Sequence, residues 1–183
     1  VARSKKFMPH FHIPLQSGDD EMLRAMRRRY RTDLYRSRID IIKQLIPDAC
    51  IGIDVITGFP GETDELFQNT MEFIQSLPVS YLHVFTYSER ANTTALRLGN
   101  VVPVSKRQER TTQLRMLSEK KKRAFYQSFI GQSRTILWEG ANEDGRMNGY
   151  TDNYIRVSQP FQSEWVNRVE EAILGEHNIR LEY

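Results

Sequence analysis

The stretch Ile53–Glu65, IDVITGFPGETDE, joins an apolar run to an acidic helix start through a turn that contains two glycines and a proline. The run from residue 49 to 58 is apolar almost throughout, which is typical of a strand in a buried parallel sheet. Thr63 is placed to cap the helix that follows, and Pro78 marks the end of that helix. A strand that passes into a helix through such a turn predicts a bound ligand or, in the simpler interpretation, only a tight turn.

The same strand–helix order occurs on both sides of this stretch. HFHIPL (10–15) and SYLHVFTY (80–87) predict strands, and helices are expected after each of the first two strands. The alternation predicts consecutive parallel β/α units. Ligands of such sheets bind beyond the carboxyl ends of the strands, so we expect the loops QSG, GFPGET and YSER to converge on one site.

Two helices are predicted between the first two strands. Asp19 or Asp20 is expected to cap the first, and Thr32 is expected to cap the second, which Pro47 ends. Apolar residues at helical spacing predict the buried face of the second helix, and they include Leu34, Ile41 and Leu45.

The pattern changes in the last third of the chain. A long basic helix is predicted over residues 105–130, ended by Gly131. The segments SRTILWEG, GRMNGYTDNYIRVSQP and NIRLEY then predict short strands of a small antiparallel barrel or sandwich, and SEWVNRVEEAIL (163–174) fits either a strand or a short helix. We place the domain boundary near residue 125, which gives domains 1–124 and 125–183.

Composition limits the class of protein. The chain of 183 residues contains one cysteine, Cys50, which excludes a disulfide framework and indicates a reducing, cytoplasmic setting. One thiolate cannot by itself hold an iron–sulfur cluster or a structural zinc ion. His10 and His12 alternate on the first strand, where they form either a metal pair or ordinary strand-end packing.

Charge is distributed unevenly along the chain. Residues 1–46 carry 11 Lys and Arg against 5 Asp and Glu, and residues 101–130 carry 8 against 2, whereas residues 131–183 carry 5 against 9. Basic segments of this kind either contact phosphate groups or form solvated helix faces.

Polar residues at the strand ends are candidates for ligand contacts. Asp54 lies within an apolar strand, where a carboxylate is costly unless it is paired or functional. Gln16 and Ser17 either hold a ribose or amide group or cap the helix. One arginine of the run 27–29 is placed to meet a carboxylate while the others face water, since successive helical residues are about 100° apart. An aromatic side chain at Tyr87 is suited to support a flat ring.

Three ordered motifs carry a resemblance to a known family. HIPLQSGDDEMLRAMRRRY, IDVITGFPGETDELFQNT and LHVFTYSERANTTA resemble the radical S-adenosylmethionine methylthiotransferases at matching spacing. The resemblance implies the second half of a partial (β/α) barrel followed by a TRAM-like antiparallel β-barrel. The family usually continues R-P-G-T-x-A after YS, whereas this chain has Ala91 and Asn92 in place of Pro and Gly, and Asn tolerates a positive φ.

The resemblance also implies cofactors and a partner. The intact enzymes use S-adenosylmethionine and two [4Fe–4S] clusters, and a 5′-deoxyadenosyl radical abstracts hydrogen from C2 of a hypermodified adenosine beside the tRNA anticodon. The cluster cysteines have no counterpart in this chain, so it resembles an inactive carboxyl-terminal fragment. Its expected partners are the tRNA anticodon stem-loop, the amino-terminal half of the same protein and, through an exposed half-barrel edge, a second copy.

Site residues follow from the matched motifs. Those implied for S-adenosylmethionine are Gln16, Ser17, Arg28 or Arg29, Asp54, the backbone from Ile56 to Gly58, Tyr87 and Ser88. Those expected to contact RNA are Lys121, Lys122, Arg123, Arg134, Arg146, Tyr154 and Arg156, with Tyr150 and Trp138 as further stacking groups and Lys120 beside them on the basic helix. No residue of the chain is assigned a catalytic or metal-ligating role.

Three branches of the family remain as alternatives. YLHVFTYSER is most similar to the branch that acts on threonylcarbamoyl-adenosine, ahead of the branches that act on isopentenyl-adenosine and on ribosomal protein S12. A stand-alone RNA-binding remnant and a radical S-adenosylmethionine enzyme without sulfur chemistry are the rival functions.

Overall fold

A computed structural model describes residues 2–4, 6–141 and 145–180. The chain forms two compact units. One, here called the α/β unit, comprises His12–Pro47 and Ile51–Lys121, and the other, here called the β unit, comprises Val1–Phe11, Asp48–Cys50 and Lys122–Tyr183. The division into a half-barrel domain and a TRAM-like domain stays a prediction.

A three-stranded sheet of order β1-β2-β3 organises the first part of the chain. Strands β2 and β3 pair in parallel, from Gly52 opposite Tyr81 to Thr57 opposite Thr86. The elements in chain order are β1 (His10–His12), α1 (Asp20–Ala25), α2 (Thr32–Leu45), β2 (Cys50–Thr57), α3 (Asp64–Ser76), β3 (Tyr81–Thr86), a 3₁₀ turn (Thr94–Arg97) and α4 (Val104–Gln127). The predicted parallel β/α units are confirmed, although β1 ends three residues before the predicted Leu15.

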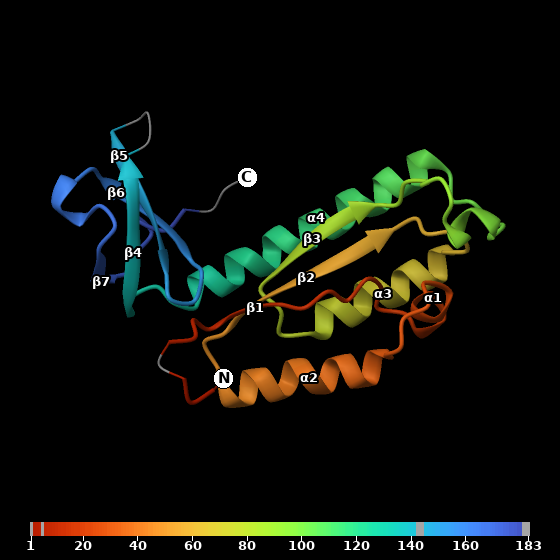
Figure 1. Cartoon of the computed structure of the whole chain (residues 1–183), viewed down its shortest axis with the longest axis horizontal. Helices are drawn as coiled ribbons and strands as arrows, with labels where there is room; N and C mark the ends of the chain where they lie inside the picture. The colour runs from red at the N-terminus through yellow and green to blue at the C-terminus, as the bar shows by residue number, and fades with distance from the viewer. Residues whose placement is uncertain (1, 5, 142–144, 181–183) are drawn as a thin grey trace. The chain divides into compact units, whose positions relative to one another are not determined.

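Helices cover one face of this sheet (Figure 1). Ile51, Ile53 and Val55 alternate along β2 and are fully buried on that face. Hydroxyl groups fix two helices against the strands: Tyr35 in α2 donates to the carbonyl of Ile13, and Ser118 in α4 bonds both backbone groups of Leu82. The core of the α/β unit therefore lies between the sheet and its helices.

Two local predictions about α1 and α2 need correction. Asp19 caps α1 as predicted, by accepting from the N–H groups of Glu21 and Met22. Thr32 does not cap α2, because Arg31 takes the cap position without a side-chain bond and the N–H of Thr32 donates to Asp20 instead. The predicted apolar face of α2 was also wrong: Leu34, Ile41 and Leu45 are exposed, and Tyr35 and Ile39 face the core.

The β unit contains an antiparallel sheet of order β6-β5-β4-β7. Its elements are β4 (Ser133–Ala141), β5 (Arg146–Thr151), β6 (Arg156–Pro160), a 3₁₀ turn (Ser163–Trp165) and β7 (Val169–Ile173). The segment SEWVNRVEEAIL (163–174) was predicted as either a strand or a short helix. It contains the 3₁₀ turn followed by β7, so both structures occur in succession. The strand predicted over residues 178–183 lies partly outside the described residues, and Ile179 forms a single bridge with Val157.

Trp138 lies in the core of the β unit and is fully buried, so the expectation that it forms part of an RNA-stacking surface is wrong. It packs among apolar side chains from the strands and from the end of α4, including Tyr126, Phe129, Ile136, Met147, Ile155, Val157 and Leu174. Its partner ring is Trp165, with centroids 5.9 Å apart.

Candidate cofactor site at the strand ends

The second face of the three-stranded sheet carries polar and aromatic side chains. Strand alternation and register place Asp54 beside His83 and Ile56 beside Phe85 on this face. His12 of β1 joins them, since its ring lies 5.4 Å from that of His83. His12, His83 and Phe85 are exposed on this face, and Phe85 is 53% exposed. We call His12, Asp54, Ile56, His83 and Phe85 the open face.

Two oxygen atoms at this end of the sheet are buried without a hydrogen bond from the described residues. One is Oδ1 of Asp54, which lies 2.9 Å from Nε2 of His12 but has no N–H aligned with it. The other is the hydroxyl of Tyr87, whose ring packs edge-on against Phe59. A buried oxygen that lacks a hydrogen bond is costly, so the Tyr87 hydroxyl is suited to bind a polar ligand. Oδ1 of Asp54 already contacts His12, and its remaining lone pair can accept from a ligand.

Two backbone N–H groups at the GFPGET loop bind within the chain. The N–H of Gly58 donates to Oε2 of Glu62 at 2.7 Å, and the N–H of Ile56 donates to the carbonyl of Gln16 at 2.9 Å. The expected position of the backbone from Ile56 to Gly58 near the adenosine stays a prediction, and it would use other backbone groups of this segment. Gly58 has φ of 75°, and a Cβ on it would lie 2.2 Å from Cγ of Arg107.

Gln16 and Ser17 are both buried beside the strand ends. The Ser17 hydroxyl lies 3.1 Å from that of Thr70 and accepts from the N–H of Asp19, so it holds α1 and α3 together. This arrangement matches the capping interpretation of Ser17 better than contact with a ribose. Gln16 has φ of 74° and continues the strand pairing through its backbone.

Two buried arginines of α4 fix the strand-end loops, and sequence reasoning missed both. Arg107 donates to the carbonyls of Val102 and Tyr87 and binds Glu89 through both terminal nitrogens. Its guanidinium also lies 5.3 Å from the ring centre of Tyr87. The basic composition of the helix did not indicate that these side chains point inward. Their spacing of three residues indicated only that Arg107 and Arg110 share a face.

Arg110 performs the same task for the GFPGET loop. It donates to the carbonyl and carboxylate of Glu62 and to Asp64, and it lies over the ring of Phe67. Burial raises the pKa of Glu62 above its ordinary value, although the Gly58 N–H and Arg110 both act in the opposite direction. Arg107 and Arg110 thus position the segments on which Tyr87 and Gly58 lie.

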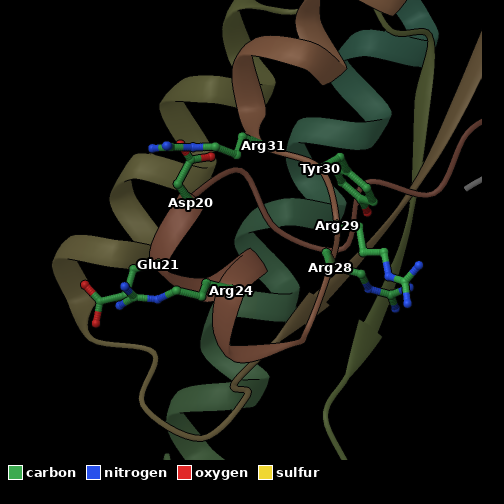
Figure 2. Close-up of a pocket in the computed structure, with 7 residues that line it drawn as sticks. All are labelled: Asp20, Glu21, Arg24, Arg28, Arg29, Tyr30 and Arg31. Carbon is green, nitrogen blue, oxygen red and sulfur yellow. The ribbon is translucent and has the colours of Figure 1, made fainter.

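The three consecutive arginines after α1 separate in space. Arg27, with φ of 57°, lines a 170 Å³ pocket together with Phe59 of the GFPGET loop and Thr93, Thr94 and Leu98. Arg28 and Arg29 line a different, 510 Å³ pocket beside α1 (Figure 2). The arginine nearest the predicted cofactor loop is therefore Arg27 rather than Arg28 or Arg29. Ser88 is exposed, and Asn92 adopts φ of 64°.

The basic residues of α4 that were proposed for RNA contact differ in their exposure and in the contacts that their side chains already make within the chain. Lys121 donates to the carbonyls of Gln75 and Leu77 at the end of α3, and burial lowers its pKa. Lys122 lies over the ring of Tyr126, and Arg123 is exposed. Lys121 therefore supports α3, which does not fit the expectation that it faces RNA.

Arginines of the β unit are largely engaged within it. Arg134 lies 2.9 Å from Asp48 and 3.7 Å from Asp152, and its guanidinium covers the ring of Phe129. Arg146 donates to the hydroxyl and carbonyl of Ser158. Arg156 is half-buried. These contacts reduce the positive charge that this unit presents to a phosphate backbone.

Tyr154 lies within a stack of three rings. The His10 ring is 4.0 Å from it and the Tyr150 ring is 5.0 Å from it, and both are nearly parallel to it. Tyr154 therefore already stacks on two rings of its own unit, although it is 44% exposed. The neighbouring 770 Å³ pocket is lined by these three rings and by apolar residues that include Phe7, Met8, Leu137 and Val169.

The described residues do not fit an iron–sulfur cluster. Cys50 is buried at the start of β2 and is the one cysteine of the sequence. Among the residues that the structure describes, no group of three or more His, Cys, Asp or Glu side chains is arranged to hold a metal ion. In the same part of the chain, no helix has the length and apolar character needed to cross a membrane.

Comparison with known proteins agrees with the motifs. Residues 2–74 match the Radical SAM superfamily. The chain is 38% identical over 159 residues to threonylcarbamoyladenosine tRNA methylthiotransferase MtaB of Bacillus subtilis, across 85% of this chain and 35% of the relative. It is 32% identical over 180 residues to tRNA-2-methylthio-N(6)-dimethylallyladenosine synthase of Desulfitobacterium hafniense, across 97% of this chain and 40% of the relative.

A third relative, MtaB of Rickettsia prowazekii, is 37% identical over 177 residues, across 95% of this chain and 42% of the relative. The chain thus spans between 35% and 42% of the length of these three relatives. Among solved structures, coproporphyrinogen III oxidase (HemN) of Escherichia coli, described as a radical SAM enzyme, has the same fold. Its TM-score is 0.53 at 12% identity, over 89% of this chain and 45% of that protein. The chain is thus similar to enzymes named as tRNA methylthiotransferases over 85% to 97% of its length, and its residues 2–74 match the Radical SAM superfamily.

Proposed function

We propose that this chain is one part of a tRNA methylthiotransferase that modifies C2 of a hypermodified adenosine beside the anticodon. The observation that carries the proposal is the similarity to enzymes of that name over 85% to 97% of the chain. In this proposal the α/β unit orients S-adenosylmethionine, and the β unit with the basic part of α4 binds the RNA. The β unit would correspond to the TRAM domain, and the α/β unit to the second half of a partial barrel.

The open face offers groups that suit S-adenosylmethionine. Oδ1 of Asp54 is an acceptor for a ribose hydroxyl, the hydroxyl of Tyr87 is both donor and acceptor, and the exposed ring of Phe85 offers a flat surface for adenine. Arg27, beside Phe59, offers a positive charge for the methionine carboxylate. When bound and reductively cleaved, S-adenosylmethionine supplies a carbon radical for hydrogen abstraction.

The chain does not supply the iron–sulfur clusters that the family uses, because its single cysteine cannot ligate one. The clusters would be held by residues outside this chain, and no chemical step is assigned to the residues described here. Their task in the proposal is to orient the cofactor and to bind the substrate. The 183-residue chain on its own is then expected to be inactive.

The first substrate we propose is threonylcarbamoyl-adenosine, on the basis of the YLHVFTYSER motif. The identities to the two kinds of relative overlap, at 35–38% and 32–38%, so dimethylallyl-adenosine is the second. The test expresses the complete reading frame that contains residues 1–183 in a bacterium that lacks its own methylthiotransferases. Mass spectrometry of its tRNA nucleosides should show the 2-methylthio form of threonylcarbamoyl-adenosine.

Appearance of the dimethylallyl product instead would reassign the substrate. Absence of both products, with RNA binding retained, would favour the second candidate, an RNA-binding module. The single cysteine is the observation that favours this alternative. Sequencing the coding region upstream of residue 1 complements the test, since a frame that continues through a C-x-x-x-C-x-x-C motif supports the enzyme.

A further inference from the structure

The 510 Å³ pocket beside α1 is lined almost entirely by charged side chains (Figure 2). One of its carboxylates already has partners: Asp20 binds the Nε of Arg31 at 2.9 Å and the N–H of Thr32 at 2.8 Å. Figure 2 shows Arg24 extending to the same side as Glu21. Arg31 and Arg24 therefore lie beside the two carboxylates of the pocket.

Arg28 and Arg29 are the other two arginines, and both are exposed. Within residues 2–4, 6–141 and 145–180, neither guanidinium has an ion pair or a hydrogen bond to a side chain or a carbonyl. Figure 2 shows both side chains on the same side of the loop, away from Asp20 and Glu21. Two like charges on one side of a loop repel each other, so an anion bound to both would lower the electrostatic energy.

The loop that carries the two arginines is held in place from several directions. The N–H of Arg28 donates to the carbonyl of Leu23, which closes the end of α1. The hydroxyl of Tyr30 donates to the carbonyl of Leu15 at 2.8 Å, and Asp20 fixes the start of α2. Because the backbone is already ordered, an anion that binds here does not have to order it.

We infer that Arg28 and Arg29 bind phosphate groups of the RNA backbone, as a contact of the α/β unit separate from the basic helix and the β unit. The inference rests on the proposed function. A guanidinium matches the geometry of a phosphate through paired N–H groups. A polyanion is favoured over a small free anion because two exposed arginines hold a small anion weakly, whereas a backbone also meets the excess of positive charge in residues 1–46.

The test measures binding of a synthetic RNA stem-loop to the full 183-residue chain over a series of salt concentrations. The variant R28Q/R29Q removes two charges from the pocket. The matched control R38Q/R97Q removes two exposed charges of the same unit outside α4, and neither arginine makes a side-chain hydrogen bond or ion pair with another described residue. The expected result is a salt slope lower by about 1.4 to 1.8 in R28Q/R29Q, at about 0.7 to 0.9 per lost phosphate contact, and a smaller change in the control.

Equal slopes in the two variants, with RNA bound by the unmodified chain, would overturn the inference and leave the proposed function standing. No RNA binding by the unmodified chain would overturn both. Inorganic phosphate and pyrophosphate are titrated in parallel. Saturable binding of either that is lost in R28Q/R29Q, without a change in the RNA slope, would assign the pocket to a small anion and overturn the inference. Circular dichroism verifies that both variants fold.

Discussion

Arg110 and Glu62 form an ion pair 2.8 Å long in which the two side chains are 3% and 1% exposed. Glu62 in turn accepts the N–H of Gly58, so the pair joins α4 to the loop that follows β2. Removing one partner leaves an uncompensated buried charge, which costs about 3–5 kcal/mol. The variant R110M should therefore lower the free energy of urea unfolding by about that amount.

The double variant E62Q/R110M is the control for this prediction. With both charges removed, it should recover part of the lost stability, although the Gly58 N–H then meets a weaker acceptor. If R110M unfolds within about 0.5 kcal/mol of the unmodified chain, a range typical of neutral surface substitutions, the pair does not hold the loop.

Gly58 and Gly61 allow a comparison within one loop. Both have positive φ, of 75° and 90°, but a Cβ on Gly58 would meet Arg107 whereas one on Gly61 would meet nothing within 4 Å. G61A should lose about 1–3 kcal/mol of unfolding free energy from backbone strain alone. G58A should lose clearly more, because the aliphatic part of the Arg107 side chain must also move. Equal losses in thermal or urea unfolding would show that Arg107 shifts at no cost.

Asp20 predicts a dependence of stability on pH. Partial burial by itself would raise its pKa, but hydrogen bonds from the Thr32 N–H and Arg31 outweigh burial and hold the pKa below the ordinary aspartate value. The unfolded chain then takes up the proton first as pH falls. The stabilisation is fully present above about pH 4, the ordinary aspartate range, and is lost as pH falls through the folded pKa. D20N should remove this loss, and D40N, an exposed change on α2, should retain it.

We predict that Asp54 and Tyr87 both contribute to the affinity for S-adenosylmethionine. If their buried oxygens bind S-adenosylmethionine, D54N and Y87F should each weaken binding of S-adenosylhomocysteine to the 183-residue chain by about tenfold, equivalent to about 1.4 kcal/mol. Isothermal titration calorimetry measures the effect without any iron–sulfur cluster. D40N is the control, because Asp40 is exposed on α2. Unchanged affinity in both variants would remove the open face from the cofactor site.

We predict different effects for substitutions of the neighbouring residues Lys120 and Lys121, one on RNA binding and the other on stability. Lys121 donates to two carbonyls at the end of α3, so K121M should lower the unfolding free energy by about 1 kcal/mol. Lys120 is exposed, and K120Q should instead reduce the salt dependence of RNA binding. A larger change of salt slope in K121M than in K120Q would contradict the role assigned to Lys121.

Much of the fold was predictable from periodicity and capping residues. The parallel strands, the caps at Asp19 and Thr63 and the long helix ended near Gly131 all depend on local sequence, and the structure confirms them. The face of α2 was not predictable in this way, because its three exposed apolar residues obey the same spacing as its buried ones.

The site was less accessible to sequence reasoning. Arg107 and Arg110 lie in a segment whose composition indicates a solvated basic helix, and only tertiary contacts with Glu89 and Glu62 reveal their burial. Ser17 resembled a ligand contact in the motif, but its hydroxyl pairs with Thr70, 53 residues away. The polar residues at the strand ends could thus be found from the sequence. Their hydrogen-bond and ion-pair partners could not, because those partners lie in distant segments of the chain.

The contacts of α4 also set the order of events in folding. Thr57 bonds Thr111, Glu62 bonds Arg110 and Leu82 bonds Ser118, across separations of 54, 48 and 36 residues. During synthesis, the GFPGET loop therefore remains without its anchors until residues 110–118 have left the ribosome. Closing such long loops is slow, so the α/β unit should acquire its structure late and cooperatively, on a timescale of about milliseconds to seconds.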